Sequence, residues 1–198
     1  MVAVRNVMTP EQEKLIVRAK AGDSQAISQL YRAHAQMIYR YIAYRVPTTA
    51  DAEDITSEVF MRMLEGLPSY EIMEVPFQAW LYRIATHRIA DFFRKKSRQK
   101  QHIELHETIA NDEPMPEESM QRQQEFKHLR NALSYLTQEQ QDVLILRFIE
   151  NKNHQDVARI LDKTPSAVRT IQHRALVRLS QLLGADEKAK HYLRGGHD

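Results

Sequence analysis

Residues 151–183, NKNHQDVARILDKTPSAVRTIQHRALVRLSQLL, carry apolar residues at helical spacing on both sides of a short polar turn. Asn153 can cap the first helix and Thr164 the second, where Pro165 takes the first helical position. The residues predicted to be buried are Val157, Ala158 and Leu161 in the first helix and Val168, Ile171, Ala175, Leu176 and Leu179 in the second. This pattern predicts a helix-turn-helix.

The second helix of this motif is predicted to expose a polar and cationic face. Its members are Ser166, Arg169, Thr170, His173 and Arg174. Such side chains suit contacts to base edges and phosphates in a major groove of DNA. The alternative is an ordinary pair of antiparallel helices with a solvated basic face.

The rest of the chain is also predicted to be all-α. Only five glycines occur in 198 residues, and no alternating Val/Ile-rich run is bounded by turn residues. Thr9 and Gln12 can form a capping box around Pro10, and Gly22 can end that first helix. Three more helices are expected from about residue 24 to before Pro47, from about residue 50 to 66, and from about residue 76 to 98.

Helical periodicity fades after Lys100, where prolines lie among acidic residues. Pro114 and Pro116 are surrounded by Glu107, Asp112, Glu113, Glu117 and Glu118. This composition predicts a linker between two small helical domains. The predicted division is a first domain at 9–99, an acidic linker at 100–124, a second domain at 125–184 and a tail at 185–198.

Composition excludes several classes of protein. The chain has no cysteine, which rules out disulfides, thiolate metal sites and a cysteine nucleophile. No apolar run reaches the roughly 18 residues of a membrane helix, and the first residues lack the apolar segment of a signal peptide. We therefore expect a cytoplasmic protein without membrane insertion.

A catalytic or metal-dependent role is not expected. His102 and His106 have the i, i+4 spacing of a two-histidine site, but a third ligand is missing. The sequence has no glycine-rich phosphate loop and no nucleophile elbow. We expect no cofactor and no small-molecule substrate.

The stretch DAEDITSEVFMRML, residues 51–64, predicts a helix with one acidic face. Asp51, Asp54 and Glu58 recur at i, i+3 and i+7, and the apolar residues on the opposite face are Ala52, Ile55, Val59 and Met63. An acidic stripe suits a cationic partner. The alternative is a solvated face in which Glu58 and Arg62 merely form an i, i+4 pair.

The helix predicted to end near residue 98 is basic. Its cations are Arg83, Arg88, Arg94, Lys95, Lys96 and Arg98, and they alternate with aromatic residues that are expected to pack inward, Trp80, Tyr82, Phe92 and Phe93. Cations on such a helix hold phosphates by releasing counterions. Duplex DNA is the expected ligand.

Together these stretches carry a family resemblance. Residues 133–179 resemble region 4 of bacterial sigma factors, while residues 21–46, 51–64 and 76–98 resemble, in order, region 2 of an extracytoplasmic-function (ECF) sigma factor of the sigma-70 family. The sequence departs from the usual pattern at a few positions. Asp162 stands where glycine is common in the turn, Ser57 replaces a frequent glutamine, and Ile171 and Gln172 match the recognition helix of primary sigma factors better.

The resemblance implies partners and site residues. Core RNA polymerase would bind through its β′ clamp helices, at Asp51, Asp54, Ser57 and Glu58, and through its β flap. Promoter DNA would meet the minus-35 residues Ser166, Arg169, Thr170, His173 and Arg174 and the minus-10 residues Ser69, Tyr70, Arg83, His87, Arg88, Arg94, Lys95 and Lys96. The acidic linker would thread through the positively lined RNA channel of polymerase. A flexible, solubilising tether is the alternative for the linker.

The loop GLPSYEIMEVPFQAW, residues 66–80, corresponds in the family to the loop that receives a flipped minus-10 base. Tyr70 offers a ring and a hydroxyl group, and Ser69 and Glu71 offer polar edges. The alternative is a plain surface turn, with Phe77 and Trp80 as ordinary core residues.

The function implied is that of a sigma factor, which binds core polymerase, recognises promoters and captures melted DNA. An anti-sigma factor is a common partner in this group. The alternative function is a stand-alone helix-turn-helix regulator that binds operator DNA unaided, usually as a dimer.

Overall fold

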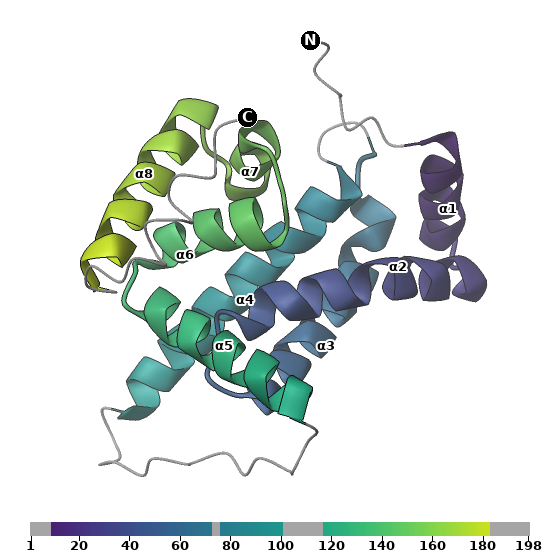
Figure 1. The fold of residues 1–198 in the computed structure, drawn as a ribbon. Helices are drawn as coiled ribbons and strands as arrows, with labels where there is room; N and C mark the ends of the chain where they lie inside the picture. The colour runs from purple at the N-terminus through teal and green to yellow at the C-terminus, as the bar shows by residue number, and fades with distance from the viewer. Residues whose placement is uncertain (1–8, 73–75, 101–116, 183–198) are drawn as a thin grey trace. The chain divides into compact units, whose positions relative to one another are not determined.

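The computed structural model describes residues 9–72, 76–100 and 117–182. These residues form helices and short connections, with no strand among them (Figure 1), so the all-α prediction is confirmed. The chain divides into two compact units, residues 1–107 and 108–198, each with its own core. None of the described helices has the combination of length and apolarity needed to cross a bilayer.

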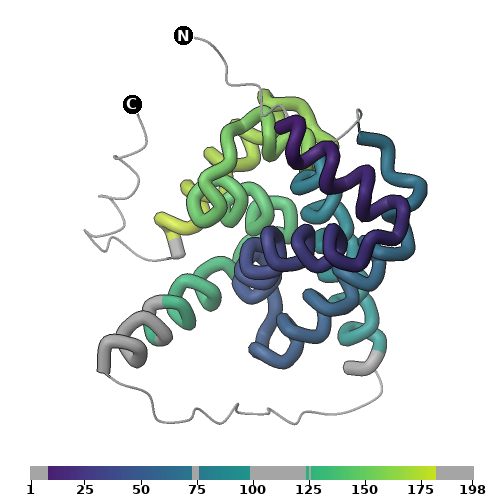
Figure 2. The backbone as a smooth tube through the Cα atoms, turned by 90° about the vertical axis from the view of Figure 1, so that its right-hand side faces the viewer, coloured from purple at the N-terminus to yellow at the C-terminus, as the bar shows by residue number. Residues whose placement is uncertain are grey.

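The first unit is a bundle built around three long helices. Its elements are α1 (Pro10–Lys20), α2 (Ser24–Ala43), α3 (Thr49–Gly66), the 3-10 turn η1 (Leu67–Ser69) and α4 (Phe77–Lys100). Helices α2, α3 and α4 contact one another pairwise, and α1 packs against α2 (Figure 1 and Figure 2). The side chains buried between them include Ile38, Tyr41, Ile42, Val59, Leu81, Tyr82 and Ile89.

The predicted helix ends of the first unit follow from local chemistry. Thr9 and Gln12 close the predicted capping box at the start of α1. Gly22 has a φ of +86°, a left-handed conformation that costs glycine little, and it lies just past the end of α1. The carboxylate of Asp23 then accepts hydrogen bonds from the first backbone N–H groups of α2.

The second unit contains the helix-turn-helix. Its elements are α5 (Glu117–Ser134), α6 (Gln138–Leu144), the π-helical turn η2 (Ile145–Ile149), α7 (His154–Leu161) and α8 (Pro165–Leu182). Helix α8 contacts α5, α6 and α7. The buried side chains of this unit include Val143, Ile145, Leu146, Val157, Val168 and Ala175.

The linker prediction needs one correction. Helix α5 begins at Glu117, so residues 117–124 of the predicted linker are helical. Acidic residues are favourable in the first turn of a helix because of the helix dipole, so negative charge there did not argue against a helix. The other predicted linker residues, 101–116, and the tail after residue 182 lie outside the described residues.

The burial pattern of the helix-turn-helix differs slightly from the prediction. Val157 and Ala158 are buried as predicted, but Ile160 is buried and Leu161 only half-buried. Helix α7 contacts both η2 and α8, so it needs a wider apolar face than contact with one neighbour requires. In α8, Val168 and Ala175 are fully buried, while the other predicted core residues, Ile171, Leu176 and Leu179, are half-buried.

Candidate nucleic-acid and polymerase interfaces

The predicted recognition face is exposed on α8. All five residues, Ser166, Arg169, Thr170, His173 and Arg174, are solvent-exposed. The turn before α8 is formed as expected, because Asp162 takes the left-handed conformation with a φ of 53°. The Lys163 N–H then bonds the Ala158 carbonyl at 2.8 Å, and Thr164 Oγ1 accepts from the Ala167 N–H at 3.1 Å. The motif thus presents a polar, cationic helix face to solvent.

Replacing Thr164 with alanine should destabilise the second unit by about 1 kcal/mol, because α8 loses the side-chain cap of its first turn. Native-state hydrogen exchange of the α7 and α8 amides measures this loss directly. Ser180→Ala is a matched control. The Ser180 hydroxyl donates to the Val177 carbonyl within α8, away from the start of the helix, so exchange should change little. Equal protection in the Thr164→Ala and wild-type proteins would contradict the capping role.

Sequence reasoning missed a polar cluster beside this face. Gln172 is half-buried, and its Oε1 atom lies 3.2 Å from Arg147 Nε and 3.0 Å from His154 Nε2. A second guanidinium nitrogen of Arg147 donates to the Lys152 carbonyl. Burial, Arg147 and the nearby Arg169 all lower the pKa of His154. The only sequence clue was a polar residue, Gln172, at the edge of the buried face of α8.

The acidic stripe of α3 has the predicted two faces. Asp54, Ser57 and Glu58 are exposed, while the opposite residues Ala52, Ile55, Val59 and Met63 are buried. In the described part of the chain Arg62 pairs with Glu65 at 2.8 Å rather than with Glu58, so the alternative pairing is not formed. The acidic stripe is thus available to a partner.

Asp51 does not belong to the freely exposed stripe. It is half-buried, and its carboxylate accepts a hydrogen bond from the Thr48 N–H at 3.3 Å. Thr48 Oγ1 accepts in return from the Asp51 N–H at 3.0 Å, which closes a capping box at the start of α3. Asp51 therefore acts first as a helix-capping residue.

Two exposed apolar side chains on α3 were also missed. Met61 is 62% exposed and Leu64 is 44% exposed. Met61 lies seven residues after Asp54 and three after Glu58, so it continues the acidic stripe toward the end of the helix. Single exposed apolar side chains are common on protein surfaces, so Met61 and Leu64 extend the stripe without by themselves marking it as an interface.

Several cations of the basic helix α4 contact other side chains of the same helix, which the sequence analysis did not predict. Arg88 and Arg94 both bond the carboxylate of Asp91, and Arg88 is only 25% exposed. Lys96 lies over the Phe92 ring, with its Nζ 5.3 Å from the ring centroid. Of the other predicted contacts, His87 and Lys95 are exposed and Arg83 is half-buried. The helix keeps a basic surface, with Asp91 holding two of the arginines in place.

The loop after α3 requires a correction at Tyr70. This side chain is only 6% exposed. Its ring centroid lies 5.5 Å from that of Phe77 and 4.8 Å from that of Trp80. Burial raises its pKa to about 12. The ring is therefore part of the core and is not presented to a base. Of the two residues that the alternative placed in the core, Phe77 is buried and Trp80 is half-buried.

Ser69 and Glu71, on either side of Tyr70, are exposed. The backbone between them is held in place, because Lys20 Nζ at the end of α1 donates to the Tyr70 carbonyl at 2.6 Å. At the start of the loop Gly66 packs closely on Trp80, where an added Cβ would lie 3.0 Å from the indole ring. The polar side chains predicted for the loop thus extend from a backbone that is held in place. Residues 73–75 lie outside the described residues.

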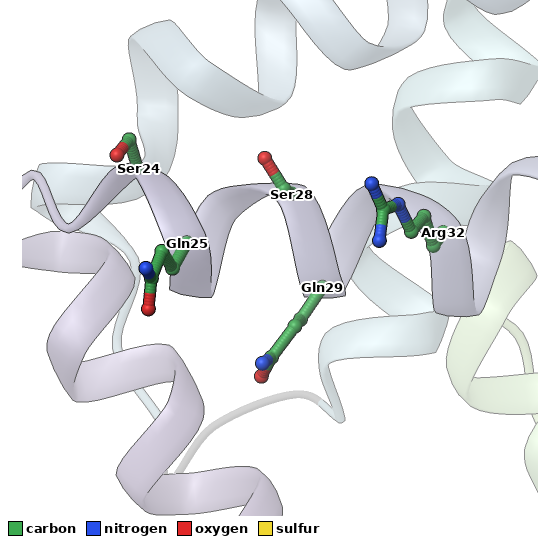
Figure 3. Close-up of a pocket in the computed structure, with 5 residues that line it drawn as sticks. All are labelled: Ser24, Gln25, Ser28, Gln29 and Arg32. Atoms are coloured by element: carbon green, nitrogen blue, oxygen red, sulfur yellow. The ribbon is translucent and has the colours of Figure 1, made fainter.

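A polar pocket of about 330 Å³ lies along α2. It is lined by Ser24, Gln25, Ser28, Gln29 and Arg32, and Figure 3 shows these side chains spaced along a single helix. A lining from one helix without aromatic or aliphatic side chains differs from an ordinary small-molecule site. Within the described residues no three His, Asp or Glu side chains lie close enough to hold a metal ion. His102 and His106 lie outside those residues.

Comparison with known proteins decides the family. Residues 30–99 match the family model of Sigma-70 region 2, and residues 132–181 match that of Sigma-70 region 4. The chain is 36% identical to the ECF RNA polymerase sigma factor BldN of Streptomyces coelicolor over 177 residues, which cover 88% of this chain and 67% of BldN. The chain belongs to the ECF RNA polymerase sigma factors.

Two further similarities agree with this assignment. The ECF RNA polymerase sigma factor SigD of Mycobacterium tuberculosis is 31% identical over 182 residues, or 87% of this sigma factor and 85% of SigD. The solved structure of the sigma factor RpoE with the anti-sigma factor NepR from Bartonella quintana has the same fold, with a TM-score of 0.64. That similarity covers 80% of this chain and 97% of that chain at 22% identity. The region 2 match covers α3 and all but the last residue of α4, and the region 4 match covers α7 and all but the last residue of α8.

Proposed function

We propose that this sigma factor binds core RNA polymerase and directs it to promoters, reading the minus-35 element with α8 and capturing melted minus-10 DNA with the first unit. The observation that carries the proposal is the recognition face of α8. Its five polar and cationic side chains are all exposed. On the inward side of α8, Val168 and Ala175 are fully buried. A helix that is apolar inward and polar and cationic outward suits a major groove.

Core polymerase would dock on the first unit through its β′ clamp helices. The exposed Asp54, Ser57 and Glu58 supply the acidic part of this surface, and Met61 adds an exposed apolar side chain. Asp51 would contribute mainly by capping α3. The β flap of polymerase would contact the second unit. An anti-sigma factor is a further proposed partner, supported by the complex of the relative RpoE with NepR.

Melted and duplex minus-10 DNA would contact α4 and the loop before it. The proposed α4 contacts are Arg83, His87, Arg88, Arg94, Lys95 and Lys96. Phosphate binding by such cations releases counterions, so this part of the affinity should fall steeply with salt. In the loop, Ser69 and Glu71 would meet a flipped base, and Tyr70 would hold the loop on the core.

The domain roles follow from this assignment. Residues 9–99 would bind polymerase and the minus-10 element, and residues 125–184 would bind the minus-35 element. The predicted linker, of which 117–124 belong to α5, would join them. The protein would act in the cytoplasm as a non-catalytic polymerase subunit, without a cofactor or a small-molecule substrate.

Transcription in vitro tests the proposal. Core polymerase with this protein as its only sigma factor should yield discrete transcripts from a library of promoter fragments randomised in both elements. Core polymerase alone should yield none of them. The alternative, a stand-alone regulator, predicts tight binding to an operator duplex without polymerase and no gain of specific transcripts.

Replacing Arg169 with alanine should weaken use of the minus-35 element. A lost bidentate base contact costs about 1 to 3 kcal/mol and relaxes specificity at one position, whereas a lost phosphate contact weakens all sequences about equally. Transcription from promoters that differ only in the minus-35 element distinguishes these outcomes. Arg178→Ala is the matched control, because Arg178 is exposed on α8 outside the predicted face. If Arg169→Ala leaves transcription of every minus-35 variant unchanged, α8 does not read the minus-35 element.

A further inference from the structure

The side chain of Gln172 joins three elements of the second unit. It extends from the middle of α8, and its oxygen lies within hydrogen-bond distance of Arg147 in η2 and of His154, the first residue of α7. Arg147 also donates to the Lys152 carbonyl in the connection between η2 and α7. Together these bonds hold the start of α7 and the preceding turn to the side of the recognition helix.

The chemistry of the partners fixes which atom of Gln172 they meet. The Nε atom of an arginine can only donate, so it must face the amide oxygen and not the amide nitrogen. That oxygen can only accept, so His154 must carry its proton on Nε2 when it bonds the same atom at 3.0 Å. A single neutral acceptor therefore serves one permanent cation and one histidine.

The surroundings of this cluster explain why a neutral acceptor suits the site. Arg147 and Arg169 both act electrostatically on His154, and with burial they lower its pKa below the ordinary value of 6.5. The hydrogen bond to Gln172 acts in the opposite direction. At neutral pH His154 thus stays uncharged and can remain close to two arginines. Since Gln172 lies three residues after Arg169 on α8, the cluster adjoins the exposed recognition face.

We propose that Gln172 is a positioning residue for minus-35 recognition, which sets how α8 and Arg169 are presented by holding Arg147 and His154 through one side-chain oxygen. Gln172 is half-buried and is not one of the five exposed residues that are proposed to face the base edges. This inference rests on the proposed role of α8. Its consequence is that specificity for the minus-35 element depends on a side chain that touches no base.

The test uses the full-length protein in holoenzyme, with promoters recovered from the randomised library by the wild-type protein. Gln172→Leu keeps a similar shape but has no acceptor. It should reduce the ratio of transcription between selected and scrambled minus-35 elements by roughly ten-fold, the size of one lost base contact. Initiation from a template already mismatched across the minus-10 region and lacking a minus-35 element should not change. Gln181→Leu, an exposed position on α8, is the matched control.

Gln172→Glu separates positioning from general stability. The carboxylate can accept both hydrogen bonds, so the transcription ratio should return toward the wild-type value even if the added charge lowers overall DNA affinity. The pKa of His154, followed by NMR titration, should fall in Gln172→Leu and rise in Gln172→Glu. A His154 pKa that is the same in Gln172→Glu as in the wild type would overturn the proposed contact, whether or not Gln172→Leu folds.

The outcomes also separate this inference from the proposed function. If Gln172→Leu keeps the wild-type ratio while Arg169→Ala loses it, the positioning role is wrong and the reading role of α8 stands. If neither substitution changes the ratio, the positioning role is wrong, and minus-35 reading by α8 is also wrong when Arg169→Ala leaves transcription of every minus-35 variant at its wild-type level. A loss of ratio in Gln172→Leu that Gln172→Glu restores supports the positioning role.

Discussion

Charge reversal at Asp54 and Glu58 should abolish binding of this sigma factor to core RNA polymerase while leaving the protein folded. Both carboxylates are exposed on α3, so the core does not depend on them. Placing two lysines against a cationic partner changes attraction into like-charge repulsion, which costs several kcal/mol at an interface. Co-purification of tagged core polymerase with Asp54→Lys, Glu58→Lys protein measures the loss, and circular dichroism checks the fold.

The control must carry the same change in net charge at another place. Glu11→Lys with Glu13→Lys meets this requirement, because both residues are exposed on α1. Reversing acidic residues in the first turn of a helix costs about 0.3 to 1 kcal/mol each, too little to unfold an ordinary domain. This control should bind polymerase normally. Binding that survives the Asp54 and Glu58 reversal would show that the β′ clamp docks elsewhere.

Asp51 is left unchanged in this experiment for a structural reason. Its carboxylate closes the capping box with Thr48, so a substitution there would weaken the start of α3 as well as the acidic surface. A loss of binding in an Asp51 variant could then have two causes. Exposed Met61 offers a cleaner extension of the test, since Met61→Lys changes the surface without removing a hydrogen bond that the structure shows.

What could be predicted from the sequence was local. The capping box of Thr9 with Gln12 depends on residues three apart, and it is formed. Left-handed backbone at Asp162 follows from the tolerance of aspartate for that conformation. The exposed face of α8 follows from helical periodicity, which also placed the acidic stripe of α3 on the outside.

What could not be predicted depends on contacts between elements distant in sequence. The burial of Tyr70 results from its packing on Phe77 and Trp80 in the next helix, and the loop sequence alone does not show that contact. The bonds of Gln172 need the fold to bring η2 and α7 beside α8. Asp91 is a different case, because it lies three residues from both Arg88 and Arg94 and could have been recognised by spacing.

Replacing Ser69 with glycine and Glu71 with serine should stop open-complex formation on duplex promoters. In the proposed function this sigma factor favours melted DNA by binding an unpaired base better than a paired one. Removing a base from the stack costs a few kcal/mol, which polar contacts in a loop must offset. Both side chains are exposed, and Tyr70 is retained because its loss would open the core.

Permanganate footprinting of unpaired thymines measures opening on a duplex promoter, and native gels measure polymerase binding. The double substitution should abolish the footprint, leave polymerase binding unchanged, and regain activity on a template mismatched across the minus-10 region, where the melting cost is already removed. Tyr70→Phe is the matched control. It keeps the packing on Phe77 and Trp80 and should open duplex promoters normally, because the ring acts through the core. Normal opening by the double variant would place base capture elsewhere in the first unit.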